Sequence, residues 1–311
     1  MSTSNKTSVQ LVKVSADHDG QRLDNFLSAR LKGLPRSAVY RMIRTGQVRI
    51  NGGRCKPSTR LCEGDEVRIP PARIREQGKI VVSEQVCKQI RDAVLFKNND
   101  LLVLNKPSGM AVHAGSGLPW GLIDVVRQLY PGEYWELAHR LDRETSGCLL
   151  LARNGSTLKH LTGLFRDGLV QKFYLCLLDG EMKEAMIEVD APLKKVQAGA
   201  ERQIEVNVEG KPALTIFRRL QAYAVCTYAE AELITGRTHQ IRVHAGHIGM
   251  PLAGETRYAS KESVNQWKKK GLHRVFLHAQ RLNFETSSGE EMEFNSPLPE
   301  SLKAVLDRLE E

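Results

Sequence analysis

The 311-residue chain has few cysteines and no long apolar run. Its six cysteines are scattered and form no C-x-x-C pair, which argues against a zinc ribbon or a disulfide framework and favours a reducing compartment. No stretch approaches the ~20 consecutive apolar residues that a membrane helix needs. Residues 1–10 are polar and lack the apolar centre of a secretory signal. We therefore expect a cytoplasmic protein that does not contact a membrane.

Positive charge is abundant but confined to one part of the chain. Residues 20–75 contain 13 of the 45 Lys and Arg but only 4 of the 36 Asp and Glu, so this segment carries the whole formal charge of +9. A protein that binds a phosphate backbone needs such a localised basic segment. Membranes and acidic proteins also attract cations, so charge alone leaves those partners open.

The basic segment is expected to form two helices and a few short strands. The apolar residues between Leu23 and Leu31 have helical spacing, and a second helix should follow with Ser37 as its N-cap and Gly46 at its end. Asn51-Gly52 is the strongest short signal for a hairpin. These features predict a compact basic module.

This module resembles the alpha-L (S4-like) RNA-binding module, which presents a pair of helices to structured RNA. Structured RNA is recognised mostly through its shape and phosphates, and this fits a module with many cations and few aromatic residues. The resemblance implies RNA contacts from Lys32, Arg36, Arg41, Arg44, Arg54 and Lys56. A basic module that binds another protein is the alternative.

We expect two domains joined by a short linker. Residues 20–75 form the small domain, residues 76–91 are charged without clear periodicity and are interpreted as the linker, and residues 92–311 form the larger domain. In the larger domain many short strands recur among few long helices, which predicts an α+β fold on a mixed, mostly antiparallel sheet. Helices are expected over residues 122–129 and 298–309.

A charged loop leads directly into an apolar strand in residues 139–152. Asp142 lies between Arg140 and Arg143, and the loop continues through Ser146-Gly147 directly into the strand. Cations on both sides favour the charged form of a carboxyl group, and the strand gives the loop a rigid floor. This loop could hold one carboxylate against a substrate. From spacing alone, a surface cluster of charges is an equally good interpretation.

The segment from Thr235 onward contains three histidines at positions 239, 244 and 247, which raises the question of a metal site. No Cys or acidic residue nearby completes a ligand set of the usual kind, so we expect no metal. Two other chemistries are disfavoured as well. Ser146 is not in a G-x-S-x-G elbow, and a glycosidase would need a pair of carboxylates rather than one acid among cations.

The nine residues His139-Arg140-Leu141-Asp142-Arg143-Glu144-Thr145-Ser146-Gly147 resemble the signature loop of the RluA family of pseudouridine synthases. Asp142 stands at the position of the family's catalytic acid. Further similarity is seen in the lysine-proline turn at 106–107, the lysine-x-tyrosine at 172–174 and the stretch at 235–244. The resemblance extends from about residue 20 to the C-terminal helix.

The resemblance implies an isomerisation of uridine to pseudouridine, in which the N1–C1′ bond breaks, the uracil turns and C5 joins C1′. Asp142 would act at the ribose–base linkage, either as a nucleophile or as the base that takes a ribose proton; both roles stay open. Arg242 would pair with this aspartate and keep it ionised. Tyr174 would stack on the base and could remove the C5 proton, and Ile241 would pack against the tyrosine ring. Arg140 would help to hold the extruded nucleotide.

The same resemblance implies the substrate and the partners. No group leaves the site in this reaction, so no cofactor is expected, in agreement with the lack of a Walker loop or a metal motif. Extruding a base costs least where it is unpaired, so the expected targets are several loop uridines of 23S ribosomal RNA, free or in a pre-ribosomal particle. A monomer is expected. The alternatives are a catalytically inactive RNA-binding factor for ribosome assembly and a nucleosidase.

Overall fold

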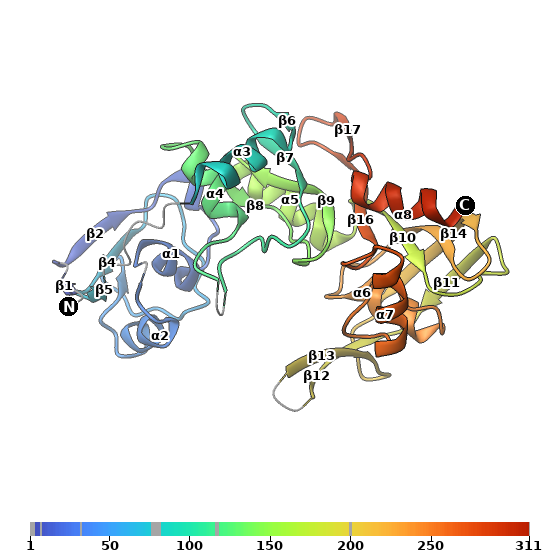
Figure 1. Cartoon of the computed structure of the whole chain (residues 1–311). Coiled ribbons are helices and arrows are strands. Elements are labelled where there is room, and N and C mark those ends of the chain that lie inside the picture. The colour runs from blue at the N-terminus through green and yellow to red at the C-terminus, as the bar shows by residue number, and fades with distance from the viewer. Residues whose placement is uncertain are drawn as a thin grey trace. The chain divides into compact units, whose positions relative to one another are not determined.

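The computed structural model of the chain divides into two compact units, a smaller one of residues 1–81 and 154–156 and a larger one of residues 82–153 and 157–311 (Figure 1). The structure describes residues 4–6, 8–31, 33–75, 82–115, 118–198 and 201–310. Within these ranges no helix is long and apolar enough to cross a lipid bilayer. Each unit has its own apolar core.

The smaller unit packs two helices against a three-stranded antiparallel sheet of order β2-β4-β3. Leu23, Phe26 and Leu27 of the first helix meet Val39 and Ile43 of the second in a fully buried core. The elements are β1 (Ser4–Lys6), β2 (Gln10–Lys13), the short 3-10 helix η1 (Ala16–His18), α1 (Leu23–Arg30), α2 (Arg36–Arg44), β3 (Arg49–Ile50), β4 (Glu66–Ile69) and β5 (Arg73–Arg75).

The expected helices and hairpin of this unit are present, but the start of α2 differs from the prediction. Its N-cap is Pro35, with φ −58° and ψ 141°, so Ser37 lies inside the helix. Proline suits this position because its ring already holds φ near −65°. Gly46, with φ 72°, follows the helix end as predicted. Asn51 and Gly52 have φ 49° and 76°, as a two-residue hairpin turn requires.

The structure differs from the expected linker over residues 76–91. Residues 76–81 lie outside the described residues, whereas α3 (Glu84–Asp92) is a helix whose Cys87 and Ile90 are buried in the core of the larger unit. Gln128 of the helix α4 (Leu122–Leu129) exchanges hydrogen bonds of 2.9 and 3.0 Å with the backbone of Val82. Only three apolar residues stand among the charges of α3, and packing against α4 decides that they form one face. The larger unit therefore begins at residue 82 rather than 92.

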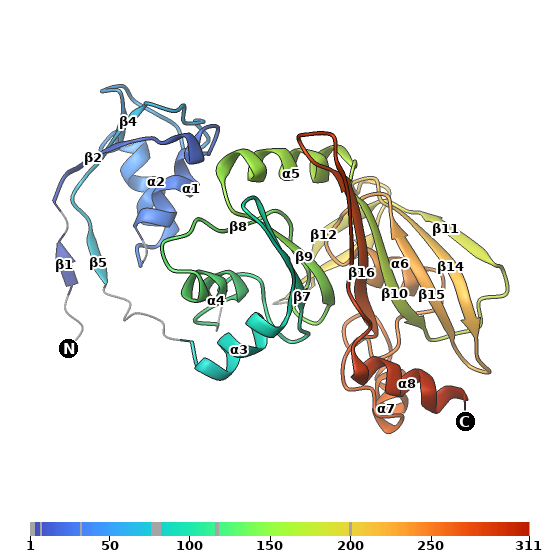
Figure 2. The same ribbon diagram turned by 90° about the horizontal axis from the view of Figure 1, so that it is seen from above.

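The larger unit is an α+β structure on one ten-stranded sheet, as predicted (Figure 2). The strand order is β11-β14-β15-β10-β16-β9-β7-β6, with β17 paired to β16 and β8 to β9. All of these pairs are antiparallel except β16 with β9, so the sheet is mixed and mostly antiparallel. The strands are β6 (Val94–Lys97), β7 (Leu101–Lys106), β8 (Glu136–Leu137), β9 (Ser146–Ala152), β10 (Gln171–Leu178), β11 (Met186–Asp190), β14 (Leu214–Ala222), β15 (Thr227–Leu233), β16 (Leu277–Glu285) and β17 (Glu291–Asn295).

Helices cover both faces of this sheet, and one hairpin stands apart from it. The predicted helix over 122–129 and the C-terminal helix are present as α4 and α8, whereas α6 and the hairpin β12–β13 were not expected. Figure 1 shows that hairpin extending away from the main sheet. The remaining elements are α4 (Leu122–Leu129), α5 (Gly155–Asp167), β12 (Leu193–Ala198), β13 (Glu201–Val206), α6 (Gln240–His247), α7 (Lys261–Lys269) and α8 (Glu300–Glu310).

Strand β9 supplies the rigid floor that the sequence predicts. All seven of its residues are buried. Leu149 and Leu151 belong to the core shared with α3 and α4, while Cys148 and Leu150 belong to the core shared with α5, because successive side chains of a strand point to opposite faces. The loop that precedes β9 is thus attached to the most buried part of the sheet.

Candidate active site

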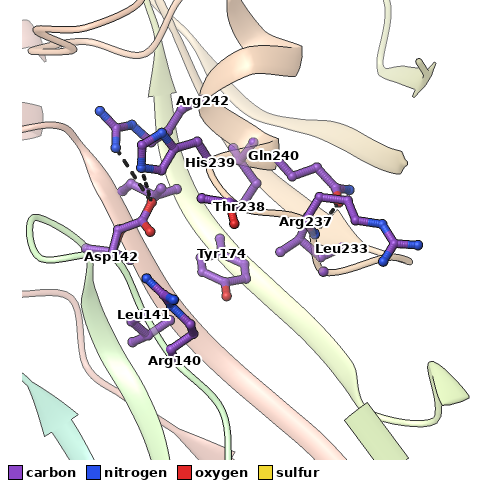
Figure 3. A pocket seen from close by; sticks show the side chains of 14 residues that line it. Arg140, Leu141, Asp142, Tyr174, Leu233, Arg237, Thr238, His239, Gln240 and Arg242 are labelled. Carbon is purple, nitrogen blue, oxygen red and sulfur yellow. Dashed lines mark hydrogen bonds and ion pairs between the residues drawn. The ribbon is translucent and has the colours of Figure 1, made fainter. Parts of the chain in front are cut away.

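The three segments proposed to form the site converge on one cavity of the larger unit (Figure 3). Its volume is about 120 Å³. The proposed residues Arg140, Asp142, Tyr174, Ile241 and Arg242 all line it. They come from the loop before β9, from β10 and from α6, which are far apart in the chain. The tertiary structure therefore brings together the residues that the sequence proposed separately.

The end of β7 and the turn after it are hydrogen-bonded to the Asp142 loop. Lys106 is fully buried, and its Nζ donates hydrogen bonds to the carbonyl oxygens of Pro107, Met110 and Arg143 at 2.9, 2.8 and 3.1 Å. The Ser108 hydroxyl donates to the carbonyl of Glu144 at 2.7 Å. The lysine-proline turn thus attaches directly to the residues that follow Asp142. Burial, together with the guanidinium of Arg274, lowers the pKa of Lys106 to about 7.

A second buried network fixes the other end of the loop. The Ser146 hydroxyl accepts a hydrogen bond from Arg274 Nη2 at 2.9 Å and lies 2.9 Å from His278 Nδ1. His278 Nε2 donates to the carbonyl of Ser296 at 3.1 Å, so Nδ1 is the acceptor for the serine proton. Burial lowers the pKa of His278 to about 4 and keeps the ring neutral. Ser146 is therefore one link of a structural network.

The expected pairing of Arg242 with Asp142 is only part of what the structure shows. Arg242 Nη1 lies 3.6 Å from Asp142 Oδ2, but its two-pronged partner is Glu255, whose carboxylate accepts from Nε and Nη2 at 2.6 and 2.7 Å. Glu255 is completely buried and also accepts from the backbone N–H of Arg257 at 2.7 Å. Glu255 fixes the guanidinium, which then presents its remaining nitrogen to Asp142.

Glu255 is a site residue that the sequence analysis missed. Burial alone would raise its pKa, but the hydrogen bonds and charge of Arg242 outweigh burial and lower the pKa. The pair is therefore ionised, and the buried guanidinium has the partner that a buried charge needs. A lone Glu thirteen residues beyond Arg242 gives no local signal of this contact.

Tyr174 lies on β10 between β15 and β16, and only 9% of it is exposed. It shares one buried cluster with Leu141 and Ile241, both of which also line the cavity. Burial, reinforced by the charge of Asp142, raises the pKa of Tyr174. The phenol therefore keeps its hydroxyl proton at neutral pH and presents an uncharged aromatic ring to the cavity.

Arg140 is exposed at the cavity edge. Figure 3 shows it on one side of Tyr174, with Arg242 and His239 on the other. No hydrogen bond or ion pair joins its guanidinium to another residue in the described ranges. An unengaged cation at the edge of a cavity is available to a nucleotide or a phosphate.

The loop before α6 places a further residue at Asp142. His239 has a left-handed backbone with φ 54° and ψ 20°, and its Nε2 lies 3.6 Å from Asp142 Oδ2. From the sequence, this histidine was a candidate only for metal binding, together with His244 and His247. The two ring nitrogens of His244 are engaged by Thr215 and by the backbone carbonyl of Ala191. Across the described residues, no three His, Cys, Asp or Glu side chains are grouped so as to hold a metal ion.

The cations proposed to bind RNA are exposed on the smaller unit, while Lys32 lies outside the described residues. This exposed set comprises Arg36, Arg41, Arg44, Arg54 and Lys56. The helix pair that carries three of them is joined by Asp24, another residue that the sequence analysis missed. Fully buried Asp24 of α1 accepts from Arg22 at 3.0 and 2.8 Å and from the Tyr40 hydroxyl of α2 at 2.7 Å.

Comparison with known proteins agrees with this geometry. Residues 100–247 match the family described as RNA pseudouridylate synthase, and residues 21–67 match the S4 domain. The chain is 46% identical to ribosomal large subunit pseudouridine synthase C of Yersinia pestis over 98% of its own length and 97% of the relative's. It is 45% identical to the protein of the same name from Escherichia coli strain K12, over 97% of each chain.

Two solved structures have similar folds. Human RNA pseudouridylate synthase domain containing 4 aligns with a TM-score of 0.61 and 25% identity, over 73% of this chain and 96% of that one. Human RNA pseudouridylate synthase domain containing 1 aligns with a TM-score of 0.58 and 28% identity, over 68% and 86%.

Proposed function

Because this chain belongs to the RNA pseudouridylate synthase family, as its RluA-type signature loop predicted, we propose that it converts several loop uridines of 23S ribosomal RNA into pseudouridine. The observation that carries the proposal is the convergence of Asp142, Tyr174 and Arg242 on one cavity. The relatives act on the large ribosomal subunit by name, and they match nearly the full length of this chain.

The proposed reaction is balanced without an external reagent. The N1–C1′ bond of uridine breaks, the uracil turns within the cavity, and a C5–C1′ bond forms; C5 then loses its proton, and N1 of the product carries one. Asp142 acts at C1′ as a nucleophile or at the ribose as a base. The ion pair of Arg242 with Glu255 supports this role, because it holds a cation beside the Asp142 carboxylate without neutralising it completely.

We assign Tyr174 to stacking on the uracil rather than to removal of the C5 proton. A phenol whose pKa is raised by burial is protonated at neutral pH and is a poor base, but its ring still offers a flat apolar surface. Ile241 completes that surface from α6. The exposed guanidinium of Arg140 is proposed to occupy the position that the extruded nucleotide vacates in the RNA, or to stabilise it electrostatically.

The smaller unit is proposed to bind the same RNA through its exposed cations. Arg36, Arg41 and Arg44 follow one helix, and Arg54 and Lys56 follow the hairpin. A monomeric enzyme is part of the same proposal. Large-subunit RNA of bacteria is made and assembled in the cytoplasm, so we propose that the protein acts there, without metal, cofactor or membrane.

Release of tritium from 23S RNA transcripts carrying [5-³H]uridine tests this function, because only attack at C5 frees the label. We expect release by the wild-type protein and none by Asp142→Asn. Glu144→Gln, which changes the neighbouring, half-exposed carboxylate, is the matched control and should keep the activity. No release by the wild type would overturn the function. Equal release by Asp142→Asn would remove Asp142 from it, and free uracil would instead identify a nucleosidase.

A further inference from the structure

His239 has a backbone conformation that its sequence position does not explain. Among the described residues, only Asn51 and His239 have positive φ without being glycine. Asn51 lies in a hairpin turn that requires this conformation, whereas His239 precedes a helix. Residues with a Cβ are rarely held in the left-handed region unless the surroundings force it, and such positions cluster at functional sites.

Gln240 supplies the surroundings that hold this backbone. Its Oε1 accepts from the backbone N–H of Arg237 at 2.9 Å and from the Thr235 hydroxyl at 2.7 Å. Its Nε2 donates to the backbone carbonyl of Leu214 at 2.9 Å. The buried amide of Gln240 thus fixes the loop to β14, and this sets the direction of the preceding side chain, His239.

The locked side chain reaches the proposed catalytic acid. His239 Nδ1 lies 2.6 Å from the Tyr258 hydroxyl, and Nε2 lies 3.6 Å from Asp142 Oδ2. Arg242 Nη1 is 3.6 Å from that same oxygen, and Figure 3 shows both contacts converging on it. The other carboxylate oxygen of Asp142 has no polar contact with any residue that the structure describes. One oxygen is held from two directions and the other is unengaged.

The partners of the ring decide where its proton lies. Burial lowers the pKa of His239, as do Arg242 and Arg257, while Asp142 and Glu255 oppose this change. The ring is therefore neutral near pH 7 and carries one proton. Burial raises the pKa of Tyr258, so the hydroxyl keeps its proton, and the backbone of Ile204 also hydrogen-bonds this group. Nε2 faces the Asp142 carboxylate, which can only accept, whereas the hydroxyl facing Nδ1 can donate. A hydroxyl that donates to Nδ1 leaves the proton on Nε2, on the side of Asp142.

We infer that His239 is a positioning residue for Asp142: a neutral imidazole, fixed in its Nε2–H form by Tyr258, that holds one carboxylate oxygen together with Arg242 and leaves the other to act on the ribose. This inference rests on the proposed function. A separation of 3.6 Å is long for a hydrogen bond, and catalytic contacts commonly shorten when substrate binds. A neutral donor orients the carboxylate without adding a second full positive charge that would weaken it as a nucleophile or base.

The tautomer can be tested without any activity measurement. In full-length protein with ¹⁵N-labelled histidine, the His239 resonances are assigned by their absence in His239→Gln. We expect the neutral Nε2–H form at pH 7, and in Tyr258→Phe a mixture of tautomers and protonation at higher pH. A neutral Nδ1–H form or an imidazolium ion at pH 7 in the wild type would overturn the inference.

Single-turnover tritium release tests the consequence for catalysis. His239→Ala should slow the chemical step about 10- to 100-fold, the effect of one lost hydrogen bond to a charged acceptor, and leave RNA affinity unchanged. His239→Asn, whose amide can donate and which tolerates left-handed backbone, should recover part of the rate. His247→Ala changes an exposed histidine at the end of α6, the helix that follows His239, and should behave as wild type.

The outcomes separate this inference from the proposed function. If the wild type releases no tritium, the function fails, while the tautomer experiment still reports on His239. If the wild type is active and His239→Ala is equally fast, only the inference is overturned. A loss of RNA affinity and of thermal stability that matches the loss of rate, without rescue by His239→Asn, would identify His239 as a packing residue and also overturn it.

Discussion

Asp24 in the smaller unit and Asp142 in the larger one are both aspartates beside arginines, yet their surroundings differ. Asp24 is fully buried, and both of its oxygens accept hydrogen bonds of 3.0 Å or less. Asp142 is 22% exposed, and its two cationic or polar neighbours stand at 3.6 Å on a single oxygen. A carboxylate whose two oxygens both accept hydrogen bonds stabilises the fold, whereas one with an oxygen left over can still react with a substrate.

The Arg242–Glu255 pair extends the comparison into the site itself. Glu255 resembles Asp24, since it is buried and accepts from three donors. Its partner Arg242 also faces Asp142. In the larger unit, the fully hydrogen-bonded carboxylate of Glu255 thus fixes a cation beside the incompletely hydrogen-bonded carboxylate of Asp142. The helix pair of the smaller unit has only a fully hydrogen-bonded carboxylate, that of Asp24.

Glu255→Gln should have the largest effect, because it removes the buried carboxylate that accepts both short hydrogen bonds of the Arg242 guanidinium. We expect a loss of about 3–5 kcal/mol in the free energy of unfolding, together with loss of tritium release. Urea unfolding measures the first. Glu232→Gln removes a carboxylate from the partly exposed pair with Arg218 and should cost about 1 kcal/mol or less. Equal losses for the two variants would mean that burial does not distinguish the pairs.

Lys106, the buried cation that is hydrogen-bonded to the Asp142 loop, should make the free energy of unfolding depend on pH. Unfolded lysine keeps its proton up to about pH 10.4, whereas the pKa of folded Lys106 is lowered to about 7, so in this interval the unfolded state binds more protons. Stability contributed through this group should therefore rise with pH from 7 to 10, by about 1.4 kcal/mol per pH unit at most.

The measurement is the difference in unfolding free energy between wild type and Lys106→Met across that range of pH. Lys303→Met, at an exposed lysine of α8, is the control and should show no such slope. Lys106→Met should also slow tritium release, because three carbonyl groups around the Asp142 loop lose their donor. A difference that does not vary with pH would contradict the lowered pKa.

Asp24→Asn should have a smaller effect than Glu255→Gln, since Arg22 is 42% exposed and water can replace its partner. We expect a loss of about 2 kcal/mol in the unfolding free energy and weaker RNA binding, with the chemical step unchanged once RNA is bound. Hydrogen bonds from Arg22 lower the pKa of Asp24.

The direction of the pH dependence follows from that lowered pKa. The stabilisation by Asp24 is complete above the unfolded carboxyl pKa of about 3.9 and is lost as the pH falls through the lower folded value. Acid titration of the unfolding free energy of wild type and Asp24→Asn should therefore converge below pH 4. A chemical step slowed in Asp24→Asn at saturating RNA would contradict the division of roles between the two units.

Arg41→Gln should have the smallest effect, on RNA affinity alone. Loss of one phosphate contact lowers the slope of log affinity against log salt concentration by about one. Filter binding at several salt concentrations measures it, and Lys268→Gln on α7 of the larger unit is the control. An unchanged slope would show that this exposed cation of the smaller unit is not a phosphate contact.

Local features of the chain were predictable because short-range physics decides them. Asn51-Gly52 forms its turn since both residues accept positive φ, and α4 follows the spacing of its apolar residues. The strand after the signature loop is a run of apolar residues, and it is buried on both faces. The start of α2 was misplaced because the polar Ser37 and the rigid Pro35 compete for the same role, and the proline occupies it.

The sequence by itself determined the family, the basic module, the α+β class and the acid at position 142, since each is written in neighbouring residues. Only the tertiary structure decided that Glu255 rather than Asp142 binds both prongs of Arg242, that Lys106 holds the loop, and that His239 faces the acid. These contacts join residues that are 13, 37 and 97 positions apart in the chain. Their energies depend on burial, which no local pattern of residues specifies.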